Sequence, residues 1–136
     1  MSSTRQKFFE GMKETNAFTK YNHFVYDEIS EDCCRMHLDL VPESLNPEGN
    51  VHGGCYFALA DSCGGALARA DGRIHVTLEA SCHYLSTVSE GRILAVGRVK
   101  RRGRTITVAD VDVTDEQGKV LFTSIFSYFC VSPQIG

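Results

Sequence analysis

Asp61 is the only charged residue in the segment from Gly54 to Ala68. This segment is about as long as an ordinary globular helix and too short to cross a membrane. An ionised carboxylate is costly to bury in such apolar surroundings, so its position requires either a partner or a function. A carboxylate near a glycine-rich helix start can serve hydrolytic chemistry, as a nucleophile or as the base that activates water.

Two glycines, Gly53 and Gly54, stand where this helix is expected to begin. The free N–H groups of the first helical turn and the positive end of the helix dipole point into the loop before it. Such a helix start can accommodate a bound phosphate or the oxyanion that forms during acyl transfer. The glycines could equally serve only to turn the loop tightly into the helix.

The spacing of these groups predicts a dimer. Eight residues of helix separate Gly53 from Asp61, which corresponds to about 12 Å. A carboxylate that acts on a carbonyl group must lie within roughly 3–3.5 Å of it. One chain therefore cannot supply both groups to one site, but a two-fold dimer with antiparallel central helices would create two identical sites.

The elements that would position these residues follow from the apolar pattern. Around the helix over residues 54–68, strands are expected over residues 22–30, 33–40, 74–83, 92–101, 104–114 and 120–131. A short amphipathic helix is expected over residues 3–15, with Phe8, Phe9 and Met12 at helical spacing. This order implies an α+β domain with one long helix packed on a curved antiparallel sheet. Glycines inside the central helix indicate close packing, most simply against another backbone.

Alternating residues support the strand over residues 74–83. The apolar residues at 74, 76, 78, 80 and 82 alternate with polar residues, including His75 and His83. This period of two is typical of a half-buried strand. We therefore expect His75 and His83 on its polar face or at a subunit contact.

The chain as a whole has the composition of one globular domain, residues 1–136, with 43% hydrophobic and 23% charged residues. Its net charge of −3 argues against a general attraction to nucleic acids or membranes. The N-terminus has no uninterrupted apolar stretch of the kind found in signal peptides, and the six cysteines form no CxxC pair. We therefore expect a cytoplasmic protein with reduced thiols.

The loop before the central helix carries a recognisable motif. Residues 46–54 have the sequence NPEGNVHGG, and Asp61 follows seven residues later. With this motif the chain resembles the hotdog-fold thioesterases, specifically the phenylacetate-degradation branch of the 4-hydroxybenzoyl-CoA thioesterase superfamily. The resemblance covers nearly the whole chain, including the turn from Arg102 to Arg104. It implies an acyl-CoA thioesterase, a homodimer or dimer of dimers, that releases CoA and a carboxylic acid without a metal or cofactor.

The resemblance also implies roles for individual residues. Gly53 would donate its N–H to the thioester oxygen, and Asp61 of the other subunit would be the nucleophile or base. Asn46 would orient the substrate or the lytic water, and His52 would support the loop and the thioester. Thr77 would hold the water.

Further candidates for substrate contact lie outside the loop. Arg102 and Arg104 belong to a basic cluster that could clamp the CoA phosphates or could simply be a solvated hairpin turn. The other members of this cluster are Lys100 and Arg101. Gly54 would add a second N–H at the helix start. Tyr84 could line either an aromatic or an aliphatic acyl pocket.

Metal binding and thiol chemistry are weaker interpretations. His52 and Cys55 lie three residues apart, but no further ligands at suitable spacing complete a zinc site. Cys55 or Cys63 could act as a nucleophile with His52, although no third residue in the sequence orients that histidine and buried structural thiols are commoner.

Two other functions would fit the same fold. Related hydratases and dehydratases, which act on acyl-CoA or acyl-carrier-protein substrates, pair a catalytic histidine with an acid, and His52 and Asp61 could be such a pair. Release of the CoA thiol separates the two reactions, because hydration leaves the thioester intact. A non-catalytic acyl-CoA binding protein would bind without turnover and would ordinarily carry a DNA-binding segment, which is not evident in this sequence.

Overall fold

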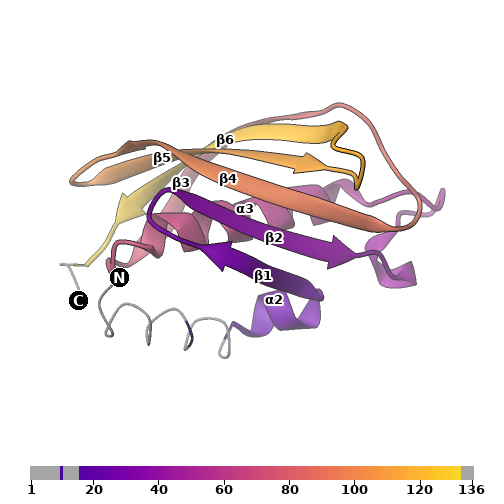
Figure 1. Ribbon diagram of the computed structural model, residues 1–136, viewed down its shortest axis with the longest axis horizontal. Helices are drawn as coiled ribbons and strands as arrows, with labels where there is room; N and C mark the ends of the chain where they lie inside the picture. Colours follow the sequence, from indigo (N-terminus) through magenta and orange to yellow (C-terminus); the bar gives the residue numbers. More distant parts are fainter. Residues whose placement is uncertain (1–9, 11–15, 133–136) are drawn as a thin grey trace.

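A computed structural model describes residue 10 and residues 16–132 and has the expected α+β architecture (Figure 1). The helices are α2 (Ala17–Tyr21), the short 3-10 helix η1 (Pro42–Ser44) and the long α3 (Gly53–Arg69). The strands are β1 (Phe24–Ile29), β2 (Cys33–Asp39), β3 (His75–Tyr84), β4 (Arg92–Arg102), β5 (Ile106–Thr114) and β6 (Val120–Cys130). The helix expected over residues 3–15, with Phe8, Phe9 and Met12, lies outside the described residues.

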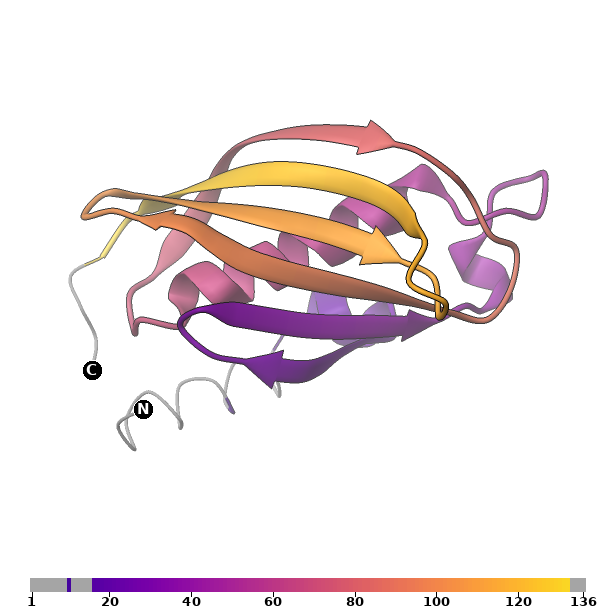
Figure 2. The ribbon, with the colours of Figure 1, turned by 45° about the horizontal axis from the view of Figure 1, so that its top comes forward.

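A six-stranded antiparallel sheet in the order β1-β2-β4-β5-β6-β3 curves over α3 (Figure 2). Strand β5 illustrates why the sheet packs on the helix, since Ala109, Val111 and Val113 are fully buried while the residues between them are only partly buried. Four of the five strand pairings contain a register shift. Such irregularities increase the local twist and favour a curved sheet.

Helix α3 is one residue longer at each end than predicted. It begins after His52, whose extended backbone ends the loop and whose Nδ1 accepts the Gly54 N–H at 2.8 Å. Towards its end, Arg69 lies in the last turn, where a positive charge suits the helix dipole. The buried face of the helix recurs every three or four residues and comprises Tyr56, Leu59, Ala60, Cys63, Gly64, Ala66, Leu67 and Ala68.

The first half of β3 has the opposite orientation from the one expected. Val76 and Leu78 are 46% and 54% exposed, whereas His75 is 2% exposed. Thr77 lies opposite the buried Tyr128 of β6. The sequence interpretation that placed His75 on the polar face was therefore wrong.

A bulge explains this error. The register of β3 against β6 shifts between Thr77 and Glu79, which leaves Leu78 as an extra residue without a partner. An extra residue reverses the alternation of faces along the strand. After it, Ala80 and Cys82 lie opposite the buried Phe126 and Ser124. The apolar pattern thus predicts the inner face only beyond the bulge.

The glycines of α3 make room for a side chain, not for a backbone as the sequence suggested. A Cβ atom on Gly64 would overlap the hydroxyl of Tyr128. Tyr128 comes from β6 and is 1% exposed. Gly64 therefore allows the phenol ring to enter the space between the sheet and the helix.

All six cysteines are free thiols, of which Cys33, Cys34 and Cys63 are buried. Within the described part of the chain, no helix has both the length and the apolar character needed to cross a bilayer.

We predict that Gly64→Ala lowers the free energy of unfolding by about 1–3 kcal/mol, because its methyl group would displace the Tyr128 ring. Gly65→Ala is the matched control. Its methyl group would lie 3.8 Å from the same ring, an ordinary contact, and replacing a helical glycine should leave stability unchanged or raise it by up to ~1 kcal/mol. Urea unfolding followed by circular dichroism measures both, and equal losses would contradict the prediction.

Candidate active site

The carboxylate of Asp61 is fixed through one of its two oxygens. The hydroxyl of Thr77 donates to Oδ1 at 2.8 Å. The hydroxyl of Tyr128 lies 3.2 Å from Oδ1 and 3.2 Å from the Asp61 carbonyl oxygen. Within residues 16–132, Oδ2 has no hydrogen-bond partner. The carboxylate is thus oriented while one oxygen stays free to react.

Neighbouring strands bring these two hydroxyls together. Thr77 of β3 and Tyr128 of β6 are direct partners in the sheet, so both side chains leave the same face towards α3. The bulge at Leu78 follows immediately and ends this local alignment. The hydroxyl at Thr77 is present where the resemblance implied it, and its contact is with Asp61 itself.

Tyr128 is the functional residue that the sequence analysis missed. Burial, followed by the nearby Asp61 charge and hydrogen bond, raises the pKa of Tyr128 well above its ordinary value. The phenol therefore stays protonated and acts as a donor. In sequence it is one of several aromatic residues in an apolar strand, and the only signal for it was the pair Gly64 and Gly65 on the facing helix.

A cavity of about 320 Å³ opens beside Asp61. Both α3 and β3 contribute to its lining, and α2 approaches it through the residue that precedes that helix. The lining residues are Asn16, Tyr26, Asp61, Ser62, Gly65, Ala66, Arg69, His75, Val76, Thr77 and Tyr128. The free carboxylate oxygen thus has space for a substrate next to it.

At the other end of α3, Gly53 carries a free N–H. Within the described residues this group has no acceptor, whereas the Gly54 N–H is held by His52. Of the two glycine donors expected from the sequence, only Gly53 is therefore available to a ligand. The Tyr84 ring covers this position, with Cε1 3.3 Å from the point where a Gly53 Cβ would lie.

Asn46 stabilises the loop that leads to this helix start. Its Oδ1 accepts the backbone N–H groups of Glu48 and Asn50, both at 3.0 Å. A bridge between Leu45 and Val51 closes the same loop. The side-chain oxygen is therefore used within the loop, and only the amide N–H groups of Asn46 can face a ligand.

Asp61 and Gly53 do not meet in one chain. They lie two helical turns apart on α3, about 12 Å along its axis. Neither Gly53 nor Tyr84 lines the cavity that contains Asp61. Within one chain these two groups therefore lie too far apart to act on the same bond.

Arg102 has a structural position that the sequence did not reveal. Its guanidinium donates to the carbonyl oxygens of Leu67 and Ala68 at the end of α3, both at 2.9 Å. It also contacts Glu31 and lies 3.1 Å from the Asp71 carboxylate. These bonds occupy the side chain that we had expected to bind phosphate.

The rest of the basic cluster is closer to the expectation of a solvated turn. Lys100 lies 3.8 Å from Asp110 across the hairpin. Arg101 and Arg104 are exposed. Arg104 remains the candidate of this cluster for a phosphate contact.

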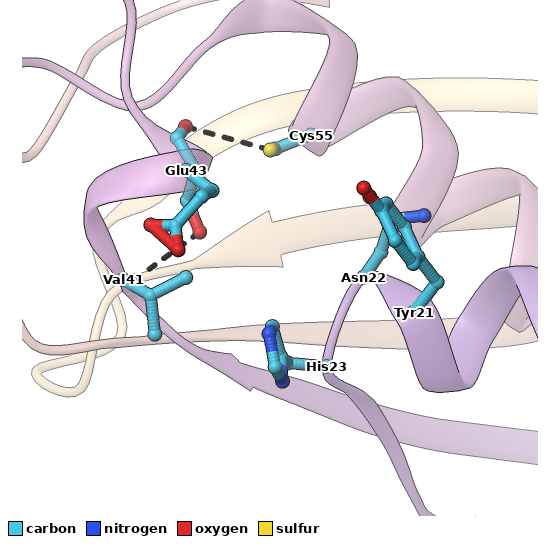
Figure 3. A pocket seen from close by; sticks show the side chains of 7 residues that line it. Tyr21, Asn22, His23, Val41, Glu43 and Cys55 are labelled. Carbon is cyan, nitrogen blue, oxygen red and sulfur yellow. Dashed lines mark hydrogen bonds between the residues drawn. The ribbon is translucent and has the colours of Figure 1, made fainter.

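A second hollow, of about 330 Å³, lies beside the first turn of α3 (Figure 3). It is lined by Tyr21, Asn22, His23, Val41, Glu43, Ser44 and Cys55. The Cys55 thiol donates to the Ser44 carbonyl at 3.5 Å, and burial raises the pKa of this thiol. Protonated cysteine is a poor nucleophile. Although slightly larger, this hollow therefore contains no activated thiol.

Metal ligands do not gather in the described part of the chain, which contains no group of three or more His, Cys, Asp or Glu residues able to hold an ion.

Comparison with known proteins gives a consistent family. The family model of the thioesterase superfamily matches residues 48–122, which include the helix start, Asp61 and Thr77. The proofreading thioesterase EntH of Cronobacter sakazakii is 29% identical over 128 residues, covering 90% of this chain and 93% of that protein.

Solved structures share the fold. The PaaI protein from the phenylacetic acid degradation operon of E. coli has a TM-score of 0.91 and 20% identity, covering 99% of both chains. A hypothetical thioesterase from Streptococcus pneumoniae, solved with coenzyme A, has a TM-score of 0.77 and 28% identity, covering 82% of this chain and 90% of that one. Alanine variants of that protein, at an aspartate and at a threonine, have also been solved. These two residues are 16 positions apart, the spacing of Asp61 and Thr77.

With its loop motif, its curved sheet around one long helix and its match to the family model, this chain belongs to the thioesterase superfamily and has the hotdog fold.

Proposed function

We propose that the protein is an acyl-CoA thioesterase whose active sites form between the two subunits of a homodimer. The observation that carries this proposal is the free Oδ2 of Asp61, held beside a cavity by Thr77 and Tyr128. A free backbone donor at Gly53 lies about 12 Å away on the same helix. The two groups become one site only when a second copy supplies the missing half.

The edge of the sheet supports dimerisation. β3 is the last strand in the sheet order, so one side of its backbone lacks a strand partner within the chain. Val76, Leu78, Tyr84 and Leu85 along and after this strand are each between 46% and 58% exposed. Edge strands with exposed apolar side chains are normally covered. A second copy on this edge would place the two α3 helices side by side and antiparallel.

In this dimer the thioester oxygen would accept the N–H of Gly53 from one subunit. The helix dipole would help to stabilise the negative charge that develops on that oxygen. Asp61 Oδ2 of the other subunit would take the proton of the attacking water or would attack the carbonyl carbon itself. Both routes need the same free oxygen, and both release the CoA thiolate from the tetrahedral intermediate. In the second route water then hydrolyses the anhydride between the acyl group and Asp61, which frees the carboxylic acid and restores the carboxylate.

Binding of CoA is supported by the Streptococcus pneumoniae relative, which was solved with coenzyme A. In this chain, exposed Arg104 would contact a phosphate and Tyr84 would line the entrance next to Gly53. Six free thiols favour a reducing compartment such as the cytoplasm.

Asp61→Asn should reduce kcat for acyl-CoA hydrolysis by about 10²–10⁴-fold, since the amide cannot act as base or nucleophile. Thiol release from a panel of acyl-CoAs measures this loss, with an enzyme-only blank for the protein's own cysteines. Unchanged melting temperature and oligomeric state would show that the variant is folded. Near-native turnover in this variant would refute the assignment.

Mixed dimers test whether the site is shared. Gly53→Pro removes the N–H at the first helical position, where proline is favoured, and His52 before it is already extended. Gly53→Ala keeps the N–H and is the matched control. A purified heterodimer of Asp61→Asn and Gly53→Pro subunits contains one complete site, so we expect about half of the native activity. An inactive heterodimer would mean that the two groups of each site come from the same subunit, which would contradict the proposal.

Tyr128→Phe should reduce kcat by about tenfold, because the Asp61 carboxylate loses one of the two hydroxyl groups that orient it. Tyr26→Phe is the matched control, since Tyr26 lines the same cavity but accepts its hydrogen bond from Asn16. Initial rates at saturating acyl-CoA would measure the loss. Native turnover in Tyr128→Phe would exclude this role.

A further inference from the structure

His75 is the least satisfied polar side chain near the active-site cavity. It is 2% exposed, and within the described residues neither Nδ1 nor Nε2 lies in hydrogen-bond geometry with a partner. It lines the cavity that contains Asp61. An unpaired buried polar group destabilises a fold, so a ligand that pairs with it is a natural explanation.

Arg69 lies next to His75 and is also incompletely paired. Its Nη2 donates to the His75 carbonyl oxygen at 2.9 Å, and its side chain lines the same cavity. Within the described residues, no carboxylate lies within ion-pair distance of Arg69. The nearest acid in this region, Asp71, already binds Arg73 at 2.7 Å and Arg102 at 3.1 Å.

The surroundings determine what His75 can do. Burial lowers the pKa of His75. The charge of Asp71 raises this pKa, whereas the charges of Arg73 and Arg102 lower it. At neutral pH the ring is therefore uncharged and carries one N–H donor. Together, His75 and Arg69 offer donors and positive charge to a ligand, while no acid of the cavity other than Asp61 opposes them.

The distances from Asp61 define the size of that ligand. His75 lies two residues before Thr77 on the same strand face, roughly 6.5 Å away. Arg69 lies two turns after Asp61 on α3, about 12 Å along the helix axis. The cavity therefore has the reactive carboxylate towards one end and the unpaired donors towards the other.

We propose that His75 and Arg69 form an anion-binding subsite for the far end of the acyl group, so that the enzyme favours acyl-CoAs whose acyl chain ends in a carboxylate. This inference rests on the proposed thioesterase function. A carboxylate accepts hydrogen bonds only and pairs well with arginine, which matches the two available donors. A chain of about six carbons separates its two end groups by roughly the distance from Thr77 to His75.

The CoA part of the substrate fits the His75 end of the cavity less well than the acyl group does. CoA is long and highly charged and must extend into solvent with its nucleotide. His75, at the end of a cavity of about 320 Å³, is almost completely buried. A short acyl group is therefore the better occupant, and free CoA provides the means to test the alternative.

The test compares adipoyl-CoA, which ends in a carboxylate, with hexanoyl-CoA, which has the same chain length and ends in a methyl group. We expect the native protein to hydrolyse adipoyl-CoA with a kcat/KM at least about tenfold higher. His75→Phe and Arg69→Met should each reduce this preference by about tenfold or more, with the larger loss on adipoyl-CoA. Arg98→Gln removes an exposed charge outside the cavity and should keep the native preference.

The outcomes separate the two proposals. A native preference for hexanoyl-CoA, or equal losses on both thioesters in the variants, would overturn the subsite and leave the thioesterase function standing. If free CoA inhibited both variants more weakly than the native protein, His75 and Arg69 would bind the CoA part of the substrate. That result would also overturn the subsite. If neither thioester nor any other acyl-CoA released thiol, the thioesterase function itself would fall. Arg69→Met alone decides the question if His75→Phe does not fold.

Discussion

The hydrogen bonds to one oxygen of Asp61 are the contact on which the rest of this structure depends. They join α3 to β3 and β6 at the point where the carboxylate would otherwise lie unpaired on an apolar helix. The tyrosine that donates one of them needs the space that Gly64 leaves. The same contacts therefore pack the helix against the sheet and orient the Asp61 carboxylate.

Residue types close together in sequence made the central helix predictable, including its glycine-rich start and its single aspartate. A lone aspartate in an uncharged segment and a glycine pair at its start identify α3, and the structure changes its limits by only one residue at each end. The sheet order also follows the expected antiparallel class. These features depend on residues close together in sequence, where spacing alone determines which face a side chain occupies.

Features that depend on distant residues were not predictable. The bulge at Leu78 reverses which residues of β3 face the helix, and no residue type in that strand indicates a bulge. Tyr128 acquires its role only from its strand partner Thr77 and the helix opposite. Arg102 has the charge for a phosphate contact, but its guanidinium is already bonded to the carbonyl oxygens at the end of α3. In each case tertiary contacts decided between alternatives that the sequence left open.

Two polar groups of the cavity, Oδ2 of Asp61 and the His75 ring, lack partners among the residues that the structure describes, and the two residues differ in burial. Asp61 is half-buried and can be solvated when no substrate is present, so its free oxygen carries little penalty. His75 is closed off from solvent, so its unpaired nitrogens destabilise the empty protein and are relieved only when something binds. A fold that retains such a residue gives up stability at a site where binding can recover it. Under the two proposals, this difference in burial would separate the residue that performs the reaction from the residue that selects the substrate.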